Sequence, residues 1–312
     1  MAIVSVARAM IASGGHVVFP TPQGYRGEGV FDNFWKLVAH WKVTYMVTVP
    51  TALSALMQRP VDADITALRG AFSGSAPLPI ELFNRFEKAT GVQIVEGYGL
   101  TECTCLVSIN PPEGNKKIGS VGLPFPYCEV KILASDGAGG LRDCAVDEIG
   151  EICVSNPGVF AGNTYTEAAK NRDLYAGEKY LRTGDLGRLD ARGLLYITGR
   201  ESDMYISGGS NVYPREVEEI LLTHPAVAEV AVLGVPDAKW GEVGVAVVVS
   251  RDPALTAQAL LAHLEGRCAK YRWPRHVFFW DALPKSGYGK ITKKDIRQML
   301  EERGDLQLQA VT

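Results

Sequence analysis

The chain has 312 residues, of which 46% are hydrophobic and 21% charged, and its formal net charge is −3. This is the composition of an ordinary soluble globular protein, long enough for two domains that each bury a core. The mild acidity argues against nonspecific nucleic-acid binding, which requires a basic patch, and no apolar run approaches the ~18 residues of a membrane span.

The first 19 residues are apolar, but Arg8 lies in their middle and no basic leader precedes them. They therefore do not resemble a secretory signal peptide. We interpret them as a buried helix that stops at Gly14 and Gly15, followed by a short strand over residues 16–19. A chain that opens on a core helix is unusual, and we expect this one to begin within a domain.

Helices and strands then alternate up to about residue 110. The segment 30–41 has helical periodicity and places five apolar side chains on one face: Phe31, Phe34, Leu37, Val38 and Trp41. Pro79 is expected to open a further helix and Gly91 to close it. Buried strands are expected over residues 43–50, 68–74 and 92–99. Strands separated by helices predict a doubly wound parallel sheet.

The pattern changes twice after residue 117. Short strands broken by turns are expected over 128–133, 150–156, 185–190 and 194–198, which predicts a small barrel or distorted sheet. Beyond residue 202 the predicted order is helix, two strands, helix, strand and helix, at 214–225, 227–236, 242–250, 257–270, 276–280 and from Thr292 onward. This order predicts a compact α+β domain of roughly 110 residues, near the common domain size.

We therefore expect two domains. The first covers residues 1–201, with an α/β part at 1–117 and a β-rich part at 118–198, and the second covers 202–312. The six cysteines form no CxxC pair and the five histidines lie far apart. Neither a disulfide framework nor zinc spacing is indicated, and the free thiols favour a reducing, cytoplasmic compartment.

The segment SGYGKIT, residues 286–292, looks like the end of a phosphate-binding loop. The Walker pattern, however, requires glycine where Pro284 stands and Ser or Thr where Ile291 stands. Two interpretations of Lys290 remain open: a solvated lysine on a turn, or an active-site cation on a hairpin.

The segment EGYGLTE, residues 96–102, matches only half of a dinucleotide fingerprint, because Glu102 occupies the third glycine position. Backbone amides at Gly97 and Gly99 and the Thr101 hydroxyl are groups that hold phosphate, and the Glu102 carboxylate suits Mg²⁺. The alternative is a glycine turn that ends a strand.

Three further segments are open to similar double interpretations. Asp185, on a glycine turn, could accept both hydroxyls of a ribose or cap the turn. Gly208 and Gly209 permit close approach of a ligand to the backbone. The segment SGSAPLP, residues 73–79, could form one side of a binding site for a flat base, or a tight turn after a strand.

In this order and spacing, the motifs resemble the acyl-adenylate-forming superfamily of acyl-CoA synthetases, peptide-synthetase adenylation domains and luciferases. The resemblance covers nearly the whole chain, and the segment GRESDMYISGGSNVYPREVEEIL, residues 199–221, is most similar to the fatty-acyl and medium-chain acyl-CoA synthetase branch. It implies an AMP-forming ligase that joins a fatty or medium-chain carboxylic acid to coenzyme A with ATP and Mg²⁺. It also implies a partial doubly wound sheet and a β-rich subdomain, followed by a small mobile α+β domain.

The resemblance also implies roles for individual residues. Thr101 would bind the α-phosphate, Glu102 would coordinate Mg²⁺, and Asp185 would bind the ribose with help from Arg200. The adenine and neighbouring parts of ATP or AMP would be held by Gly74, Ser75, Ala76, Pro77, Glu96, Gly97, Tyr98 and Gly99.

Lys290 matches the adenylation lysine of the family, so Lys290, Thr101 and Glu102 form the expected catalytic set. The pantetheine of coenzyme A would approach along Ser207, Gly208 and Gly209. The hinge position, usually Asp or Lys, is Ser202 here, which puts the hinge energetics in question. Gly97 and Cys103 flank the adenylate loop and are expected to border the acyl pocket.

The family's Ser/Thr/Gly-rich phosphate loop and its histidine-containing substrate motif do not occur in this chain. We therefore expect a C-terminal part of an acyl-CoA synthetase, inactive alone, whose apolar surface near residues 1–50 promotes homo-oligomers. The alternative is a non-catalytic or degenerate adenylate-binding module that acts as an interaction protein. An assembly-line adenylation domain is disfavoured, because no carrier domain follows.

Overall fold

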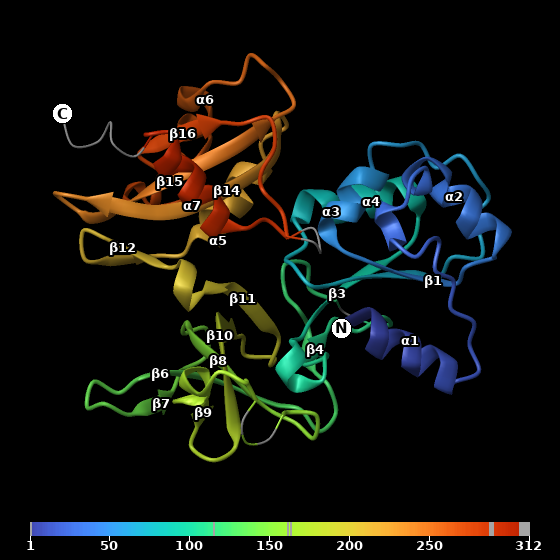
Figure 1. Cartoon of the computed structure of the whole chain (residues 1–312), viewed down its shortest axis with the longest axis horizontal. Coiled ribbons are helices and arrows are strands. Elements are labelled where there is room, and N and C mark those ends of the chain that lie inside the picture. Colours follow the sequence, from blue (N-terminus) through green and yellow to red (C-terminus); the bar gives the residue numbers. More distant parts are fainter. Residues whose placement is uncertain (1, 115, 161, 163, 287–289, 306–312) are drawn as a thin grey trace. The chain divides into compact units, whose positions relative to one another are not determined.

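The computed structural model describes residues 2–114, 116–160, 162, 164–286 and 290–305, with side chains from residue 7 onward. It divides into two compact units: Met1–Thr183 with Gly187–Ile197, and Gly184–Leu186 with Thr198–Thr312. The expected division at residue 201 stays a prediction. Figure 1 shows the order of the elements, and each unit is described by itself.

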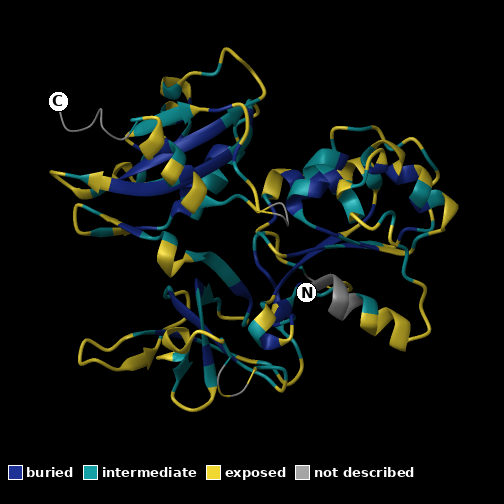
Figure 2. Ribbon diagram, in the orientation of Figure 1, coloured by how far each residue is buried: buried dark blue, intermediate teal, exposed yellow. Residues whose placement is uncertain are grey.

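A five-stranded sheet, ordered β1-β2-β3-β4-β5, forms the α/β part of the first unit. Its strands are β1 (Tyr45–Thr48), β2 (Gly70–Ser73), β3 (Ile94–Tyr98), β4 (Ser108–Ile109) and β5 (Leu123–Pro124). The first three are parallel, as expected for a doubly wound sheet, whereas β4 and β5 run antiparallel. The parallel strands are short and mostly buried (Figure 2).

The helices of this part are α1 (Ala2–Ala12), α2 (Val30–His40), α3 (Pro50–Leu56) and α4 (Ile80–Thr90), with short 3₁₀ turns at Gly24–Arg26 and Thr101–Cys103. Three of them, α2, α3 and α4, share one hydrophobic core with β1 and β3 through residues such as Trp35, Leu53 and Phe86. Gly91 ends α4 in the left-handed conformation (φ 69°), as predicted.

The expectations for residues 1–41 are partly wrong. Residues 16–19 form no strand, because no described strand lies beside them to complete a ladder. The helix α1 is not a core helix over its described side chains, since Met10 and Ile11 are 42% and 63% exposed. In α2 the expected Phe34 and Val38 are buried together with Trp35, whereas Trp41, just after the helix, is 48% exposed.

A six-stranded sheet, ordered β11-β10-β8-β6-β7 with β9 beside β10, forms the β-rich part. Its strands are β6 (Glu129–Ser135), β7 (Leu141–Asp143), β8 (Gly150–Ser155), β9 (Tyr175–Ala176), β10 (Tyr180–Leu189) and β11 (Leu195–Arg200), and a 3₁₀ turn spans Ala168–Asn171. Apolar side chains of β8, such as Ile152 and Val154, share a core with Tyr98 and Val107. The segment of residues 96–102, the predicted adenylate loop, is thus anchored in this core.

The second unit is a mixed sheet ordered β13-β12-β15-β14, with β16 parallel to β15. Its strands are β12 (Tyr205–Ser207), β13 (Ser210–Val212), β14 (Val227–Asp237), β15 (Gly241–Ser250) and β16 (His276–Phe279). Its helices are α5 (Pro214–Leu222), α6 (Ala257–His263) and α7 (Lys293–Glu302), with 3₁₀ turns at Glu201–Asp203 and Lys270–Arg272.

Alternate side chains along β14 and β15 pack into two different hydrophobic cores. Val230 and Val232 belong to a core with α5 and α6. Ala231 and Leu233 belong to a second core with α7. Because successive strand residues point to opposite faces, one pair of long strands supports helices on both sides.

Two glycines of this sheet lie opposite each other, Gly234 in β14 and Gly244 in β15. The fully buried Tyr205 ring lies across both. A Cβ at Gly234 would come within 2.3 Å of Tyr205 Cβ, and one at Gly244 within 2.2 Å of Tyr205 Oη. The buried Tyr205 hydroxyl has no hydrogen-bond partner among the described residues.

Among the described residues, none of the helices combines the length and apolar character needed to cross a bilayer.

Candidate functional site

The predicted adenylate loop, residues 96–102, begins in the last residues of β3 and is shaped by close packing. A Cβ at Gly99 would lie 1.4 Å from the carbonyl oxygen of Cys105, and one at Gly97 would lie 2.8 Å from the Phe72 ring. Both glycines are therefore required by the protein's own packing, whether or not a ligand approaches them. Tyr98 between them is buried.

The loop of residues 74–77 is tied to β3 through Glu96. The Glu96 side chain is buried, and its Oε1 accepts a hydrogen bond from the Leu78 backbone N–H at 3.0 Å. Its carbonyl oxygen accepts from the Asn110 N–H. Ser75 adopts a left-handed conformation, with φ of 69°. Glu96 thus couples the two predicted adenine segments to each other.

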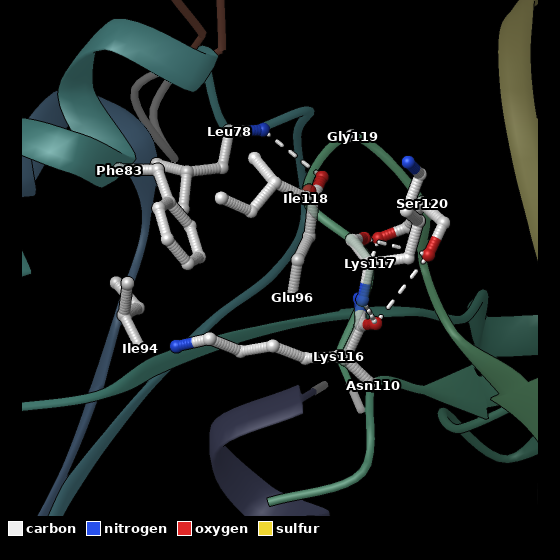
Figure 3. A pocket seen from close by; sticks show the side chains of 10 residues that line it. All are labelled: Leu78, Phe83, Ile94, Glu96, Asn110, Lys116, Lys117, Ile118, Gly119 and Ser120. Carbon is white, nitrogen blue, oxygen red and sulfur yellow. Dashed lines mark hydrogen bonds between the residues drawn. The ribbon is translucent and has the colours of Figure 1, made fainter. Parts of the chain in front are cut away.

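A small pocket lies beside this link (Figure 3). Its wall includes Glu96, Phe83 and Lys116, and the Lys116 ammonium lies 4.9 Å from the centre of the Phe83 ring. The same ammonium pairs with Glu87. Asn110 closes the neighbouring loop by donating to the Ser120 carbonyl at 2.6 Å. Residues that line the pocket are thus tied to one another and to Glu87.

Glu102 is held from two directions within the first unit. Its carbonyl oxygen accepts from the Phe160 N–H at 2.9 Å. Its Oε1 accepts from the Tyr165 hydroxyl at 2.5 Å. Burial, and then the hydrogen bond to Glu102, raise the pKa of Tyr165 to about 12. Thr101, next to Glu102 in the same 3₁₀ turn, is exposed.

Asp185, Arg200 and Lys290 form an electrostatic group within the second unit. Arg200 Nε donates to Asp185 Oδ1 at 3.0 Å, and Asp185 is buried while the Arg200 side chain is 63% exposed. Desolvation, and then the charge of Arg200, lower the pKa of Lys290, with Asp185 opposing them. Lys290 itself remains on the surface.

The lysine segment is a hairpin that leads into α7. Lys285 bridges Ile291 in antiparallel fashion, and the Ser286 N–H donates to the Lys290 carbonyl at 2.8 Å. Residues 287–289 of the motif lie outside the described part of the chain. The hairpin places Lys290 three residues before the first residue of α7, Lys293.

Gly208 and Gly209 form the two-residue turn between β12 and β13. Their φ angles of 56° and 82° are those of a tight hairpin turn, which glycine adopts at least cost. The Gly208 N–H donates to the Trp240 carbonyl at 2.9 Å, and a Cβ there would lie 2.8 Å from the Trp240 ring. A Cβ at Gly209 would meet nothing within 4 Å. Ser207 pairs with Ser210 across the turn.

The structure thus links residues 74–77 to Glu96 and continues to Thr101 and Glu102, and it groups Asp185 with Arg200 and Lys290. Ser202 lies exposed in the 3₁₀ turn Glu201–Asp203. Tyr165 is not predictable from the sequence, because 63 residues separate it from Glu102 and no motif marks it. Among the described residues, no group of three or more His, Cys, Asp or Glu could hold a metal ion.

Two family descriptions match the chain in order. Residues 1–163 match the AMP-binding enzyme family, and residues 216–290 match the AMP-binding enzyme C-terminal domain.

The curated relatives are CoA ligases. A marinolic acid–CoA ligase of Pseudoalteromonas sp. (strain SANK 73390) is 34% identical over 95% of this chain and 46% of its own length. An indoleacetate–CoA ligase of Aromatoleum aromaticum is 38% identical over 87% of this chain and 53% of its own length. A long-chain-fatty-acid–CoA ligase of Salmonella typhimurium is 37% identical over 86% of this chain and 47% of its own length. The chain spans about half the length of these relatives.

Solved structures agree in fold. ATP-bound MatB from Rhodopseudomonas palustris has a TM-score of 0.80 at 33% identity, over 87% of this chain and 53% of that one. The o-succinylbenzoate CoA synthetase of Bacillus subtilis, with its acyl-adenylate intermediate, has a TM-score of 0.74 at 35% identity, over 86% and 53%.

Proposed function

Because this chain belongs to the AMP-binding enzyme family, we propose that it serves an AMP-forming acid–thiol ligase, which activates a carboxylic acid with ATP and passes the acyl group to coenzyme A. One observation carries the proposal: three similar relatives are all named CoA ligases although their acids differ. The element common to those names is the reaction, so the likeness supports the reaction more strongly than any one acid.

The proposed reaction has two steps. A carboxylate oxygen attacks the α-phosphorus of ATP, the bond to pyrophosphate breaks, and an acyl-adenylate forms. The CoA thiol then loses its proton and attacks the acyl carbonyl, and AMP leaves with the bonding electron pair. Negative charge builds on the leaving pyrophosphate in the first step only, so cations and hydrogen-bond donors placed beside that leaving group accelerate adenylation.

Lys290 and Thr101 are the proposed donors for this step. The lowered pKa of Lys290 indicates an ammonium that is partly desolvated and faces another cation, and such a group gains more from an arriving phosphate than one in bulk water. The exposed Thr101 offers a neutral hydroxyl for the α-phosphate.

Glu102 is the proposed protein ligand of Mg²⁺. When bound, this ion neutralises phosphate charge. Mg²⁺ in nucleotide sites is usually held by one or two carboxylates together with the phosphates, so a lone carboxylate fits the ion.

The nucleoside is assigned to two groups of residues. The adenine would lie against residues 74–77 and 96–99, where Glu96 acts through its bond to the Leu78 N–H, which sets the shape of the loop. The ribose hydroxyls would bond to Asp185, whose carboxylate is already oriented by Arg200.

Coenzyme A is assigned to the turn of Ser207, Gly208 and Gly209. Gly208 packs against Trp240, whereas the Gly209 position is open on the side where a Cβ would stand. An open backbone of this kind admits an extended pantetheine chain. Ser202 remains the proposed hinge between the adenylation and thioester arrangements.

A fatty or medium-chain acid is the proposed substrate, with Gly97 and Cys103 near the acyl group. Cys103 is only 2% exposed and belongs to an apolar cluster, which suits an alkyl chain better than a charged one. The cysteines of the described residues are all free, which supports a reducing compartment such as the cytoplasm.

Mass spectrometry tests the proposal directly. The chain spans about half the length of its CoA-ligase relatives, so it is joined to the N-terminal half of one of them for the assay. The joined protein is incubated with ATP, Mg²⁺, coenzyme A and acids of graded length, and acyl-AMP, acyl-CoA and pyrophosphate are measured. We expect Lys290→Ala to slow acyl-AMP formation about a hundredfold, the usual effect of losing one contact made in the transition state, while thioester formation from preformed acyl-AMP is little changed. Equal slowing of both steps contradicts the role of Lys290.

The alternative of a non-catalytic adenylate-binding module predicts a different result. Calorimetry would then detect AMP binding, and no acid in the panel would release pyrophosphate or form acyl-AMP.

A further inference from the structure

The loop between β8 and β9 forms hydrogen bonds with both the backbone and the side chain of Glu102. The Phe160 N–H donates to the Glu102 carbonyl oxygen at 2.9 Å. The Tyr165 hydroxyl donates to Glu102 Oε1 at 2.5 Å. A third link joins the same segments, from the Thr104 hydroxyl to the Gly158 carbonyl at 2.5 Å. The two segments are therefore held together at several points.

Tyr165 is itself held in place by Asn171. The Asn171 Oδ1 accepts from the Tyr165 N–H at 2.9 Å, and its Nδ2 donates to the Tyr165 carbonyl at 2.7 Å. One amide side chain thus satisfies both main-chain groups of Tyr165. Tyr175 adds a bond from its hydroxyl to the Phe160 carbonyl. Such a doubly bonded residue loses little further freedom when its side chain makes one more contact.

We infer that Tyr165 is a positioning residue for the Glu102 carboxylate. This inference rests on the proposed role of Glu102 in holding Mg²⁺. The phenol takes one carboxylate oxygen, Oε1, and no other hydrogen-bond partner of this carboxylate is found among the described residues. Oε2 is left for the ion. Carboxylates that ligate metals are typically oriented by such outer hydrogen bonds, and loss of one lowers metal affinity by about 10- to 100-fold.

A purely structural role makes a different prediction. If Tyr165 only anchored the loop, loss of its hydroxyl would act like loss of any other loop hydroxyl. Tyr175 provides the matched control, since it begins β9 directly after the same loop. Its hydroxyl contacts the Phe160 carbonyl and the Thr164 hydroxyl, with no hydrogen bond to Glu102. Tyr165→Phe and Tyr175→Phe each remove one phenol oxygen and leave the ring.

The test measures metal binding rather than turnover. Mn²⁺ replaces Mg²⁺, and the affinity of the chain for Mn²⁺–ATP is read from the electron paramagnetic resonance signal of free Mn²⁺. We expect Tyr165→Phe to weaken Mn²⁺–ATP binding by about 10-fold and Asn171→Ala to weaken it in the same direction. Tyr175→Phe should match the wild type. The affinity for AMP without metal should be unchanged in all three.

Each remaining outcome counts against the inference in a recognisable way. If Glu102→Gln weakens Mn²⁺–ATP binding and Tyr165→Phe does not, the positioning role is wrong and the proposed role of Glu102 stands. If Tyr165→Phe and Tyr175→Phe weaken it equally, the tyrosine is a loop anchor only. If the wild type and Glu102→Gln bind alike, or neither binds, the metal role of Glu102 is wrong and the inference is wrong with it.

Discussion

At the scale of single residues, glycines in the candidate site serve packing as much as ligand approach. Gly99 leaves no room for a side chain against the Cys105 carbonyl, and Gly208 leaves little against Trp240. The motif letters alone could not show this, because the atoms that exclude a Cβ come from other parts of the chain. Lys290 and Thr101, for which a chemical role of the side chain is proposed, are exposed instead.

Tyr127 is a residue whose conformation conflicts with its type. It has a φ of 64° and is 87% exposed, in a turn closed by the Cys128 N–H and the Phe125 carbonyl. The left-handed conformation costs a non-glycine residue ~1–2 kcal/mol, and glycine costs ~0.5–1 kcal/mol in chain entropy. We expect Tyr127→Gly to raise the free energy of unfolding by about 0.5–1 kcal/mol in urea titrations.

Asp173 is the control for this prediction. It is exposed and also left-handed, with φ of 53°, but aspartate tolerates that conformation better than tyrosine. Asp173→Gly should therefore raise the free energy of unfolding by less than Tyr127→Gly does. A Tyr127→Gly protein no more stable than wild type would show that the ring contributes contacts that outweigh the strain.

At the scale of elements, the ends of helices are easier to predict from the sequence than the pairing of strands. Gly91, Pro214 and Thr292 mark helix termini in the structure as in the sequence, because capping depends on a few neighbouring residues. The helix α3 is not among the predicted elements, since Pro50 marks only the end of the strand expected over residues 43–50. The β12–β13 hairpin is also absent from the prediction, which assigns its glycine turn only to contact with a ligand.

The candidate site divides in the same way. Residues 96–102 are contiguous, so a sequence motif is enough to propose them as a unit. The partner of Glu102, Tyr165, comes from another element and could not be found, because long-range contacts leave no local pattern.

The Tyr205 ring packs across Gly234 in β14 and Gly244 in β15, and this packing leads to a prediction about stability. Gly244→Ala places a Cβ 2.2 Å from Tyr205 Oη, and overpacking of a core typically costs ~1–3 kcal/mol. Tyr205→Phe removes a buried hydroxyl that has no described partner, so alone it should be neutral or stabilising. In the double variant it should restore most of the lost stability.

Gly234→Ala is the matched control, measured with the others by chemical unfolding. Its new Cβ would meet Tyr205 Cβ rather than the hydroxyl, so Tyr205→Phe should give no rescue there. Rescue of both glycine variants, or of neither, would contradict the packing described for this ring.

At the scale of the whole molecule, the second unit carries its own cores. Every buried residue of the two clusters on the faces of β14 and β15 lies between Tyr205 and Leu300. A sheet with helices on both faces and two enclosed cores meets the usual requirement for independent folding.

We therefore predict that residues 203–312, expressed alone, unfold in one cooperative thermal transition followed by circular dichroism. The reason is that none of the residues in these two cores is removed. The variant Val232→Asp, which buries an unpaired charge in one core, serves as the unfolded reference. A gradual, non-cooperative melt of the parent segment would contradict the prediction.

The glycine turn of β12 and β13 bears on how this protein would change under neutral drift. Its two glycines satisfy a hairpin and a tryptophan contact, so purifying selection for folding alone would retain them in a copy that had lost its activity. The Lys290 side chain makes no hydrogen bond or ion pair within the described residues, and folding would not preserve it. Among natural variants of this chain, persistence of Lys290 would therefore report selection for chemistry, while persistence of Gly208 and Gly209 would not.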